Sequence, residues 1–307
     1  MKHTWKITLM LLAIFIAAQL VGLFVITKYI DYAALKETGK TSYRGLPFDI
    51  QRPEVEESFS YIYIILAVII GTLLLLLLIK FRKVGLWKAW FFVAIVATLT
   101  VSLAAFIQQY VALCLAIVIA LWKILRPNIY IHNLSEILIY GGLAAIFTPI
   151  INIFSGIMLL IFISLYDMYA VWRSKHMVAM AKFQTESKLF AGLYLPYDRE
   201  RQKDEKMEKR IIAEHRPSEL VVKTQKTAIL GGGDIGFPLI FTGVVMKSLI
   251  NEGLTIGNAF MMSMIVIATT SLALFLLLWK SQKDTFYPAM PFLSAGCLLG
   301  YGIVWLL

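Results

Sequence analysis

Nine apolar stretches, most of them about twenty residues long, constrain the fold of this chain more than any other feature of its sequence. A helix that crosses the hydrocarbon core of a bilayer needs roughly twenty consecutive apolar residues. The chain is 59% hydrophobic and 16% charged, a composition that excludes an ordinary soluble domain. We therefore expect an all-α polytopic membrane protein with about nine transmembrane helices. The expected spans are 7–26, 61–79, 86–106, 110–125, 134–149, 151–171, 228–249, 259–279 and 286–307.

The first apolar stretch follows the short basic segment 1–6 and could belong to a signal peptide. The apolar region of a signal peptide is shorter, roughly 7–15 residues. A run of about twenty residues is instead the length of a full span. The sequence therefore predicts a first helix that is retained in an integral protein of the cell membrane.

Positive charge predicts the orientation, because segments on the cytoplasmic side of a membrane are enriched in Lys and Arg. With the N-terminus inside, the inside segments carry 23 Lys and Arg residues and the outside segments carry 6. An odd number of spans then puts the C-terminus outside. The formal net charge of +10 is explained by this asymmetry, so we expect no nucleic-acid partner.

Two polar segments divide the expected spans. The outside segment 27–60 is interpreted as a solvated connector. The inside loop 172–226 contains a dense run of mixed charge at 198–210, which predicts a solvated helix or a disordered stretch. This loop separates a membrane domain of helices 1–6, residues 1–171, from a second membrane domain of helices 7–9, residues 227–307. We expect the loop to take part in gating or in substrate access.

Three acids fall within or beside the apolar stretches, where an ionisable group is costly and is by default a candidate for function. Glu136 lies near the inside end of its span, which favours an interfacial or helix-capping role. Asp167 precedes Arg173 by six residues, and Asp234 follows Lys226 by eight. At the helical rise these separations are about 9 Å and about 12 Å. The two aspartates are therefore expected at similar depth on consecutive, antiparallel helices.

A facing pair of carboxyls has a known chemistry. Like charges a few ångströms apart do not both ionise, so the two groups share one proton. The ionised member can take a proton from water while the protonated member polarises a carbonyl. This chemistry needs neither a metal nor a cofactor. The two cysteines, Cys114 and Cys297, lie in apolar runs and support neither a disulfide framework nor a metal site.

The residues around these acids predict irregular backbone. Asp234 follows three consecutive glycines and is followed by Pro238, which cannot donate a hydrogen bond to the Asp234 carbonyl. We interpret this region as a transmembrane helix loosened beside a polar cavity. Pro288 and Pro291 keep the start of the last span from being a regular helix. Unpaired backbone groups there could pair with an extended peptide.

Three short motifs in this order resemble one family. They are Tyr166-Asp167, the run 231–234 with the sequence GGGD, and the run 288–291 with the sequence PAMP. They resemble the YD, GxGD and PAL motifs of the presenilin and signal-peptide-peptidase family of intramembrane aspartyl proteases, and the archaeal-type presenilin homologues most of all. The resemblance extends over the whole chain through span count and loop placement. The sequence departs from the family pattern at Met290, where Leu is usual, and Gly232 occupies the variable position.

The resemblance implies that Asp167 and Asp234 are the catalytic aspartates of an enzyme that cleaves transmembrane segments of other proteins in the lipid bilayer. By analogy with presenilins, substrates would have their N-termini outside. Nothing in the sequence requires a partner subunit, and a homo-oligomer stays open. The resemblance also implies a set of residues that shape the site and contact substrate, namely Tyr166, Gly231, Gly232, Gly233, Pro288, Ala289, Met290 and Pro291.

Other classes of protein compete with this interpretation. Paired intramembrane acids on broken helices are also typical of ion-coupled secondary transporters, in which they bind H⁺ or Na⁺. A membrane scaffold without catalysis would leave the matched depths of the two acids unexplained. A prepilin-type peptidase shares a GxGD motif, but nine spans and the motif at Pro288 fit it poorly.

Overall fold

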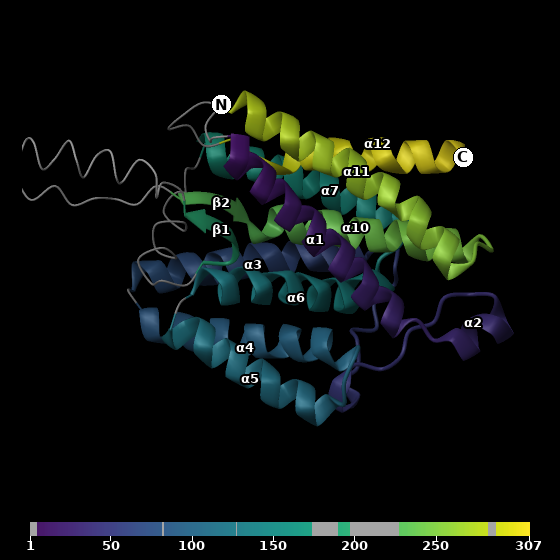
Figure 1. The fold of residues 1–307 in the computed structure, drawn as a ribbon, viewed down its shortest axis with the longest axis horizontal. Coiled ribbons are helices and arrows are strands. Elements are labelled where there is room, and N and C mark those ends of the chain that lie inside the picture. Colours follow the sequence, from purple (N-terminus) through teal and green to yellow (C-terminus); the bar gives the residue numbers. More distant parts are fainter. Residues whose placement is uncertain (1–4, 82, 127, 174–189, 197–226, 282–286) are drawn as a thin grey trace, which may run out of the picture.

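A computed structural model describes residues 5–81, 83–126, 128–173, 190–196, 227–281 and 287–307. Helices account for most of these residues, and a small sheet caps one end of the helical bundle (Figure 1). The longer helices are α1 (Trp5–Tyr29), α3 (Ser60–Lys80), α4 (Val84–Ala104), α5 (Gln109–Leu125), α6 (Ile129–Phe147), α7 (Ile153–Met168), α10 (Gly232–Asn251), α11 (Ile256–Lys280) and α12 (Met290–Leu306). The short elements are helix α2 (Tyr32–Thr38), the 3₁₀ turns Pro47–Asp49 and Thr148–Ile150, the π-helical turn Tyr169–Arg173, and strands β1 (Gly192–Pro196) and β2 (Thr227–Gly231).

The expected class of fold is confirmed. Among the described residues, seven helices are long and apolar enough to cross a membrane, and α5 and α12 are apolar helices of 17 residues each. Large apolar side chains are exposed along many of them, as the lipid-facing side of a membrane protein requires. The segment 27–60 is more structured than a simple connector, because it contains α2, capped by Asp31 at its start and by Gly39 in the left-handed conformation at its end.

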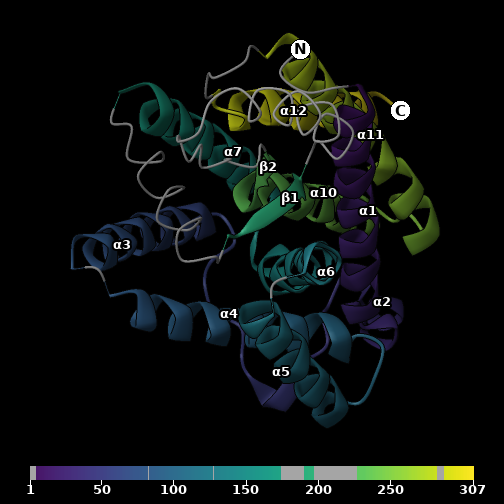
Figure 2. The ribbon, with the colours of Figure 1, turned by 60° about the vertical axis from the view of Figure 1, so that its left-hand side comes forward.

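Helix α10 occupies the centre of the bundle. Within its most apolar 18-residue window, 78% of the residues are buried, against 11% for α3. Helices α1, α6, α7, α11 and α12 all contact α10. Figure 2 shows α3 and α4 at the edge of the bundle, with α3 standing away from α1. The molecule therefore has a tightly packed centre and a loosely packed side.

Glycines allow the closest helix contacts. Helix α12 approaches α11 through Gly296 and Gly300, where a Cβ atom would lie 2.8 Å from the Cα of Thr270 and 2.6 Å from the Cα of Val266. This spacing of two small residues four apart is the usual means by which membrane helices pack closely. Gly142 plays the same part between α6 and α4, since a Cβ there would lie 2.0 Å from the Thr98 carbonyl oxygen.

The two strands correct the expected start of the seventh span. Residues 228–231 were expected to be helical, but they lie in β2, and α10 begins only at Gly232. Strand β1 comes from the loop 172–226 and pairs antiparallel with β2, with Gly192 opposite Gly231. Part of that loop is therefore ordered against the membrane domain, and its charge run at 198–210 lies outside the described residues.

A polar seam closes the other end of the bundle. Lys247, near the end of α10, is buried and donates hydrogen bonds to the carbonyl oxygens of Pro149 at 2.9 Å and Ile151 at 3.4 Å. Its ammonium also forms an ion pair with Glu57 at 2.7 Å. These contacts tie α10 to the turn between α6 and α7 and to the segment before α3.

Candidate active site

A cavity of about 700 Å³ opens between the helices near the sheet. Side chains from α3, α4, α6, α7 and α10 line it, and most of its wall is apolar. Asp167 and Asp234 both line this cavity. The structure thus brings together the two acids that the sequence singled out.

Asp167 lies in the last turn of α7, and its side chain is 8% exposed. Its carboxylate accepts a hydrogen bond from the backbone N–H of Met290 at 3.1 Å. That N–H is available because Met290 is the first residue of α12, where backbone donors have no partner within the helix. Pro291 stands at the start of the same helix, a position that tolerates proline well.

The run PAMP therefore acts through backbone geometry. Pro288 is buried and Ala289 is half-buried, and neither lines the cavity, whereas Met290 does. Pro291 does not line it either. The expectation that these backbone groups are unpaired is wrong for the Met290 N–H, because Asp167 accepts its hydrogen bond.

Asp234 lies in the first turn of α10, directly after the sheet. Gly231 is the N-cap of this helix, and its backbone N–H is directed at the Asp234 carboxylate. An acid in this position is stabilised by the partial positive charge at the helix N-terminus. The carboxylate is half-buried because one side faces the cavity.

The sequence predicted that the three glycines before Asp234 loosen the interior of a helix. This prediction is wrong, because α10 begins only at Gly232. The glycines form the corner between β2 and α10, and all three line the cavity. At Gly232 a Cβ atom would lie 2.7 Å from the hydroxyl oxygen of Tyr140. A larger residue there would have to displace the Tyr140 ring of α6. Pro238 does lie within α10, as expected.

Tyr166 lines the same cavity beside Asp167. Its hydroxyl donates a hydrogen bond to Thr72 Oγ1 at 3.1 Å, which connects α7 to α3. Helix α3 has few other contacts with the bundle, so this bond helps to hold one wall of the cavity in place. In the motif Tyr166-Asp167, the tyrosine therefore binds α3 and the aspartate accepts a hydrogen bond from the backbone of α12.

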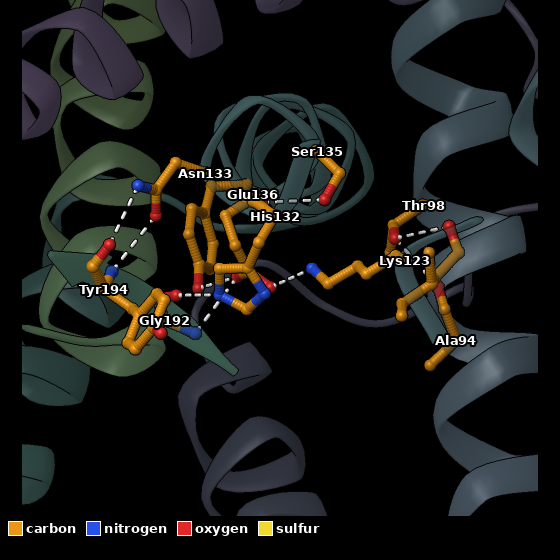
Figure 3. A network of polar contacts seen from close by, with 11 residues as sticks. Ala94, Thr98, Lys123, His132, Asn133, Ser135, Glu136, Gly192 and Tyr194 are labelled. Atoms are coloured by element: carbon orange, nitrogen blue, oxygen red, sulfur yellow. Dashed lines mark hydrogen bonds and ion pairs between the residues drawn. The ribbon is translucent and has the colours of Figure 1, made fainter. Parts of the chain in front are cut away.

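Sequence reasoning missed a second polar group in the cavity wall. Glu136 was expected at the membrane interface or at a helix cap, but Asn128 caps α6 and Glu136 is 1% exposed. The Glu136 carboxylate pairs with Lys123 from α5 and accepts a hydrogen bond from the Tyr140 hydroxyl (Figure 3). A lysine inside the apolar run of α5 was the signal that could have revealed this pair.

The part of the chain that the structure describes brings no three His, Cys, Asp or Glu side chains together in the way a metal site needs. Cys114 is exposed and Cys297 is buried, and both are free thiols. Cys297 lies 3.3 Å from Thr270 Oγ1 between α11 and α12. Acid–base chemistry by carboxyls is therefore what the described cavity can offer.

The sequence profile of a family described as signal-peptide peptidase, presenilin aspartyl protease matches residues 21–307. The chain belongs to this family of aspartyl proteases. It is accordingly an aspartic endopeptidase of the intramembrane-cleaving, presenilin-like type and an integral multi-pass membrane protein. The family assignment gives no support to the transporter alternative.

Solved structures agree with the family at the level of fold. The structure is similar to that of a presenilin family intramembrane aspartate protease in a P2 crystal form, with a TM-score of 0.60 and 17% sequence identity over 99% of both chains. In a C222 crystal form the TM-score is 0.61 at 17% identity, covering 97% of this chain and 98% of the other. A comparison with curated proteins found no match.

Proposed function

We propose that this presenilin-family protease hydrolyses peptide bonds within transmembrane segments, with Asp167 and Asp234 as its catalytic pair. The observation that carries the proposal is that both carboxyls line one cavity, which is enclosed mainly by apolar helices. Two acids in such a place are costly unless they are used. Each carboxyl is also held by backbone, through Met290 for Asp167 and through Gly231 for Asp234.

The reaction uses a water molecule held between the two carboxyls. One carboxyl is ionised and takes a proton from the water, while the other is protonated and donates a hydrogen bond to the oxygen of the scissile carbonyl. The attack gives a tetrahedral intermediate without a covalent bond to the enzyme. Collapse of this intermediate, with transfer of a proton to the departing amine, completes hydrolysis.

The proposed topology has nine spans, with the N-terminus inside and the C-terminus outside. In support, α1 begins at the end of the bundle where the sheet lies, and α12 ends at the opposite end (Figure 1). The loop 172–226 then lies inside, between a membrane domain at 1–171 and a second at 227–307. By analogy with presenilins, substrates would have their N-termini outside.

A substrate helix has all its amides bonded internally, so cleavage requires that it be locally unwound. We place the extended segment beside the corner at Gly231–Gly233 and the motif at Pro288–Pro291, because the three glycines and Met290 line the cavity with the two carboxyls. Since Asp167 already binds the Met290 N–H, the segment must pair with other backbone groups. The loop 172–226 contributes to substrate access, and deleting residues 198–210 with no change in cleavage would contradict this.

The test is peptide cleavage by purified protein in liposomes, with a labelled single-span substrate. The Asp167→Asn and Asp234→Asn variants should each lose activity at least about 10³-fold, because neither amide can exchange the proton that the reaction needs. Asp31→Asn, at the N-cap of α2 and outside the lining of the cavity, is the control and should keep full activity. Full activity in either site variant rejects the pair, and ion flux without cleavage would favour a transporter.

A further inference from the structure

Three residues of α6 bind the outer edge of β1 (Figure 3). The side-chain amide of Asn133 donates to the Tyr194 carbonyl at 2.9 Å, and its oxygen accepts from the Tyr194 N–H at 3.1 Å. His132 Nε2 lies 2.8 Å from the Gly192 carbonyl oxygen, and Glu136 Oε2 accepts from the Gly192 N–H at 3.1 Å. These side chains form the hydrogen bonds that a third strand would form with β1, so they attach the sheet to α6.

Of the three α6 residues that bind β1, Glu136 is the one that also lines the cavity. Both it and Lys123 are almost fully buried, at 1% and 3% exposure. The carboxylate receives three donors, from Lys123, Tyr140 and the backbone of Gly192. Phe91 covers the Lys123 ammonium, with its ring centre 6.0 Å away.

The same carboxylate also fixes the corner before Asp234. Glu136 holds the Tyr140 hydroxyl, and a Cβ atom at Gly232 would lie 2.7 Å from that hydroxyl oxygen. The Gly232 N–H donates to the Ala191 carbonyl at 3.1 Å, next to the residue that Glu136 binds in β1. Two short connections therefore run from Glu136 to a residue two positions before Asp234.

A buried ion pair that only stabilised the fold would need none of these links, since apolar side chains of similar volume often replace such pairs without loss. We propose that Glu136, with Lys123 as its counter-ion, is a positioning residue for proteolysis. It holds β1 and Tyr140 in one place, and they hold the Gly231–Gly233 corner and the Asp234 carboxyl. This inference rests on the proposed function of the aspartates, and no chemical step passes through Glu136.

The decisive test compares two double variants, Lys123→Met/Glu136→Gln and Lys123→Met/Glu136→Met. Both are neutral, leave no buried unpaired charge and have similar side-chain volumes, but only Gln keeps an oxygen that can accept from Gly192 and Tyr140. With Met at 136, kcat should be at least about tenfold lower than with Gln, at unchanged KM, because small misplacements of reacting groups cost this much. Hydrogen exchange in residues 192–196 should also be faster with Met.

Equal kcat in the two double variants would overturn the proposal, and so would a difference in melting temperature alone. Tyr140→Phe keeps the Lys123–Glu136 pair intact and serves if the Met variant does not fold. Its kcat should be several-fold lower at unchanged KM, and wild-type kcat would also overturn the proposal. Failure of the aspartate chemistry is distinguishable, because Asp167→Asn or Asp234→Asn would then keep full cleavage, or the wild-type protein would show none.

Discussion

Within the described residues, two ion pairs between a buried lysine and a glutamate lie at opposite ends of the bundle, and they differ in what surrounds them. At the sheet end, the side chains of Lys123 and Glu136 are each 2% exposed and border the cavity that holds the two aspartates. At the other end, the Lys247 side chain is 8% exposed but that of Glu57 is 46% exposed. The first pair is removed from water on both sides, and the second is only half removed.

The two pairs also differ in the groups that they bind. Lys247 binds the Pro149 and Ile151 carbonyl oxygens in the turn between α6 and α7, so its charge closes a seam between backbone segments. Glu136 instead binds a strand and a tyrosine next to the candidate catalytic corner. Changes at the sheet end should therefore alter catalysis, whereas changes at the seam should alter stability.

The largest contrast is expected between two glycines on the same helix. At the sheet end of α10, the Cβ of Gly232→Ala would meet the Tyr140 hydroxyl oxygen at 2.7 Å. We expect cleavage to fall at least about tenfold, because the corner beside Asp234 must shift. The matched control is Gly243→Ala near the seam, where the Cβ would meet Ile26 Cδ1 and Thr148 Oγ1, each at 2.7 Å.

Gly243→Ala should destabilise the protein by about 1–3 kcal/mol through overpacking and leave kcat unchanged. The two variants are compared by initial rates of cleavage and by unfolding in mixed micelles. If Gly243→Ala lowers kcat as much as Gly232→Ala does, the two ends of α10 are not functionally different and the comparison fails.

Lys247→Met should have a smaller effect, and only on stability. The variant leaves two backbone carbonyls without their donor and removes the partner of Glu57. We expect a loss of about 2 kcal/mol in the free energy of unfolding, with cleavage per folded molecule unchanged. A fall in kcat without a change in stability would show that the seam communicates with the cavity.

Glu57→Gln should have the smallest effect. The Glu57 side chain is 46% exposed, and a glutamine oxygen can still accept a hydrogen bond from Lys247. The expected loss is below about 1 kcal/mol, as for other ion pairs that reach water. The same denaturation experiment measures it, and a loss as large as that of Lys247→Met would mean that the ion pair itself holds the seam.

The helices could be predicted because each depends on a local property, a run of apolar residues long enough to cross a bilayer. The grouping of Asp167 and Asp234 was also predicted, and both line one cavity. The depth calculation behind it used a helical rise for residues that include 227–231, which are extended in β2. The two acids still line one cavity, because antiparallel neighbours bring their ends to the same side of the bundle, whichever rise applies.

The sheet and the Glu136 network could not be predicted because their partners are distant in the sequence. Gly192 pairs with Gly231, and the strands have only five residues each, too few for a clear alternating pattern. Three glycines within an apolar run have the same sequence at a strand–helix corner as inside a loosened helix. Glu136 has a plausible local role at a helix end, whereas its actual partner Lys123 lies on another helix.

Helix α10 is held along nearly its whole length, by the sheet and Tyr140 at one end and by Lys247 at the other. The polar residues near its two ends, Asp234 and Lys247, are thirteen residues apart, which is about 20 Å along the helix axis. Helix α7 has a freer setting, because it continues into a π-helical turn and faces the sparsely packed α3. We therefore expect any motion that changes the separation of the two carboxyls to arise in α7 more than in α10.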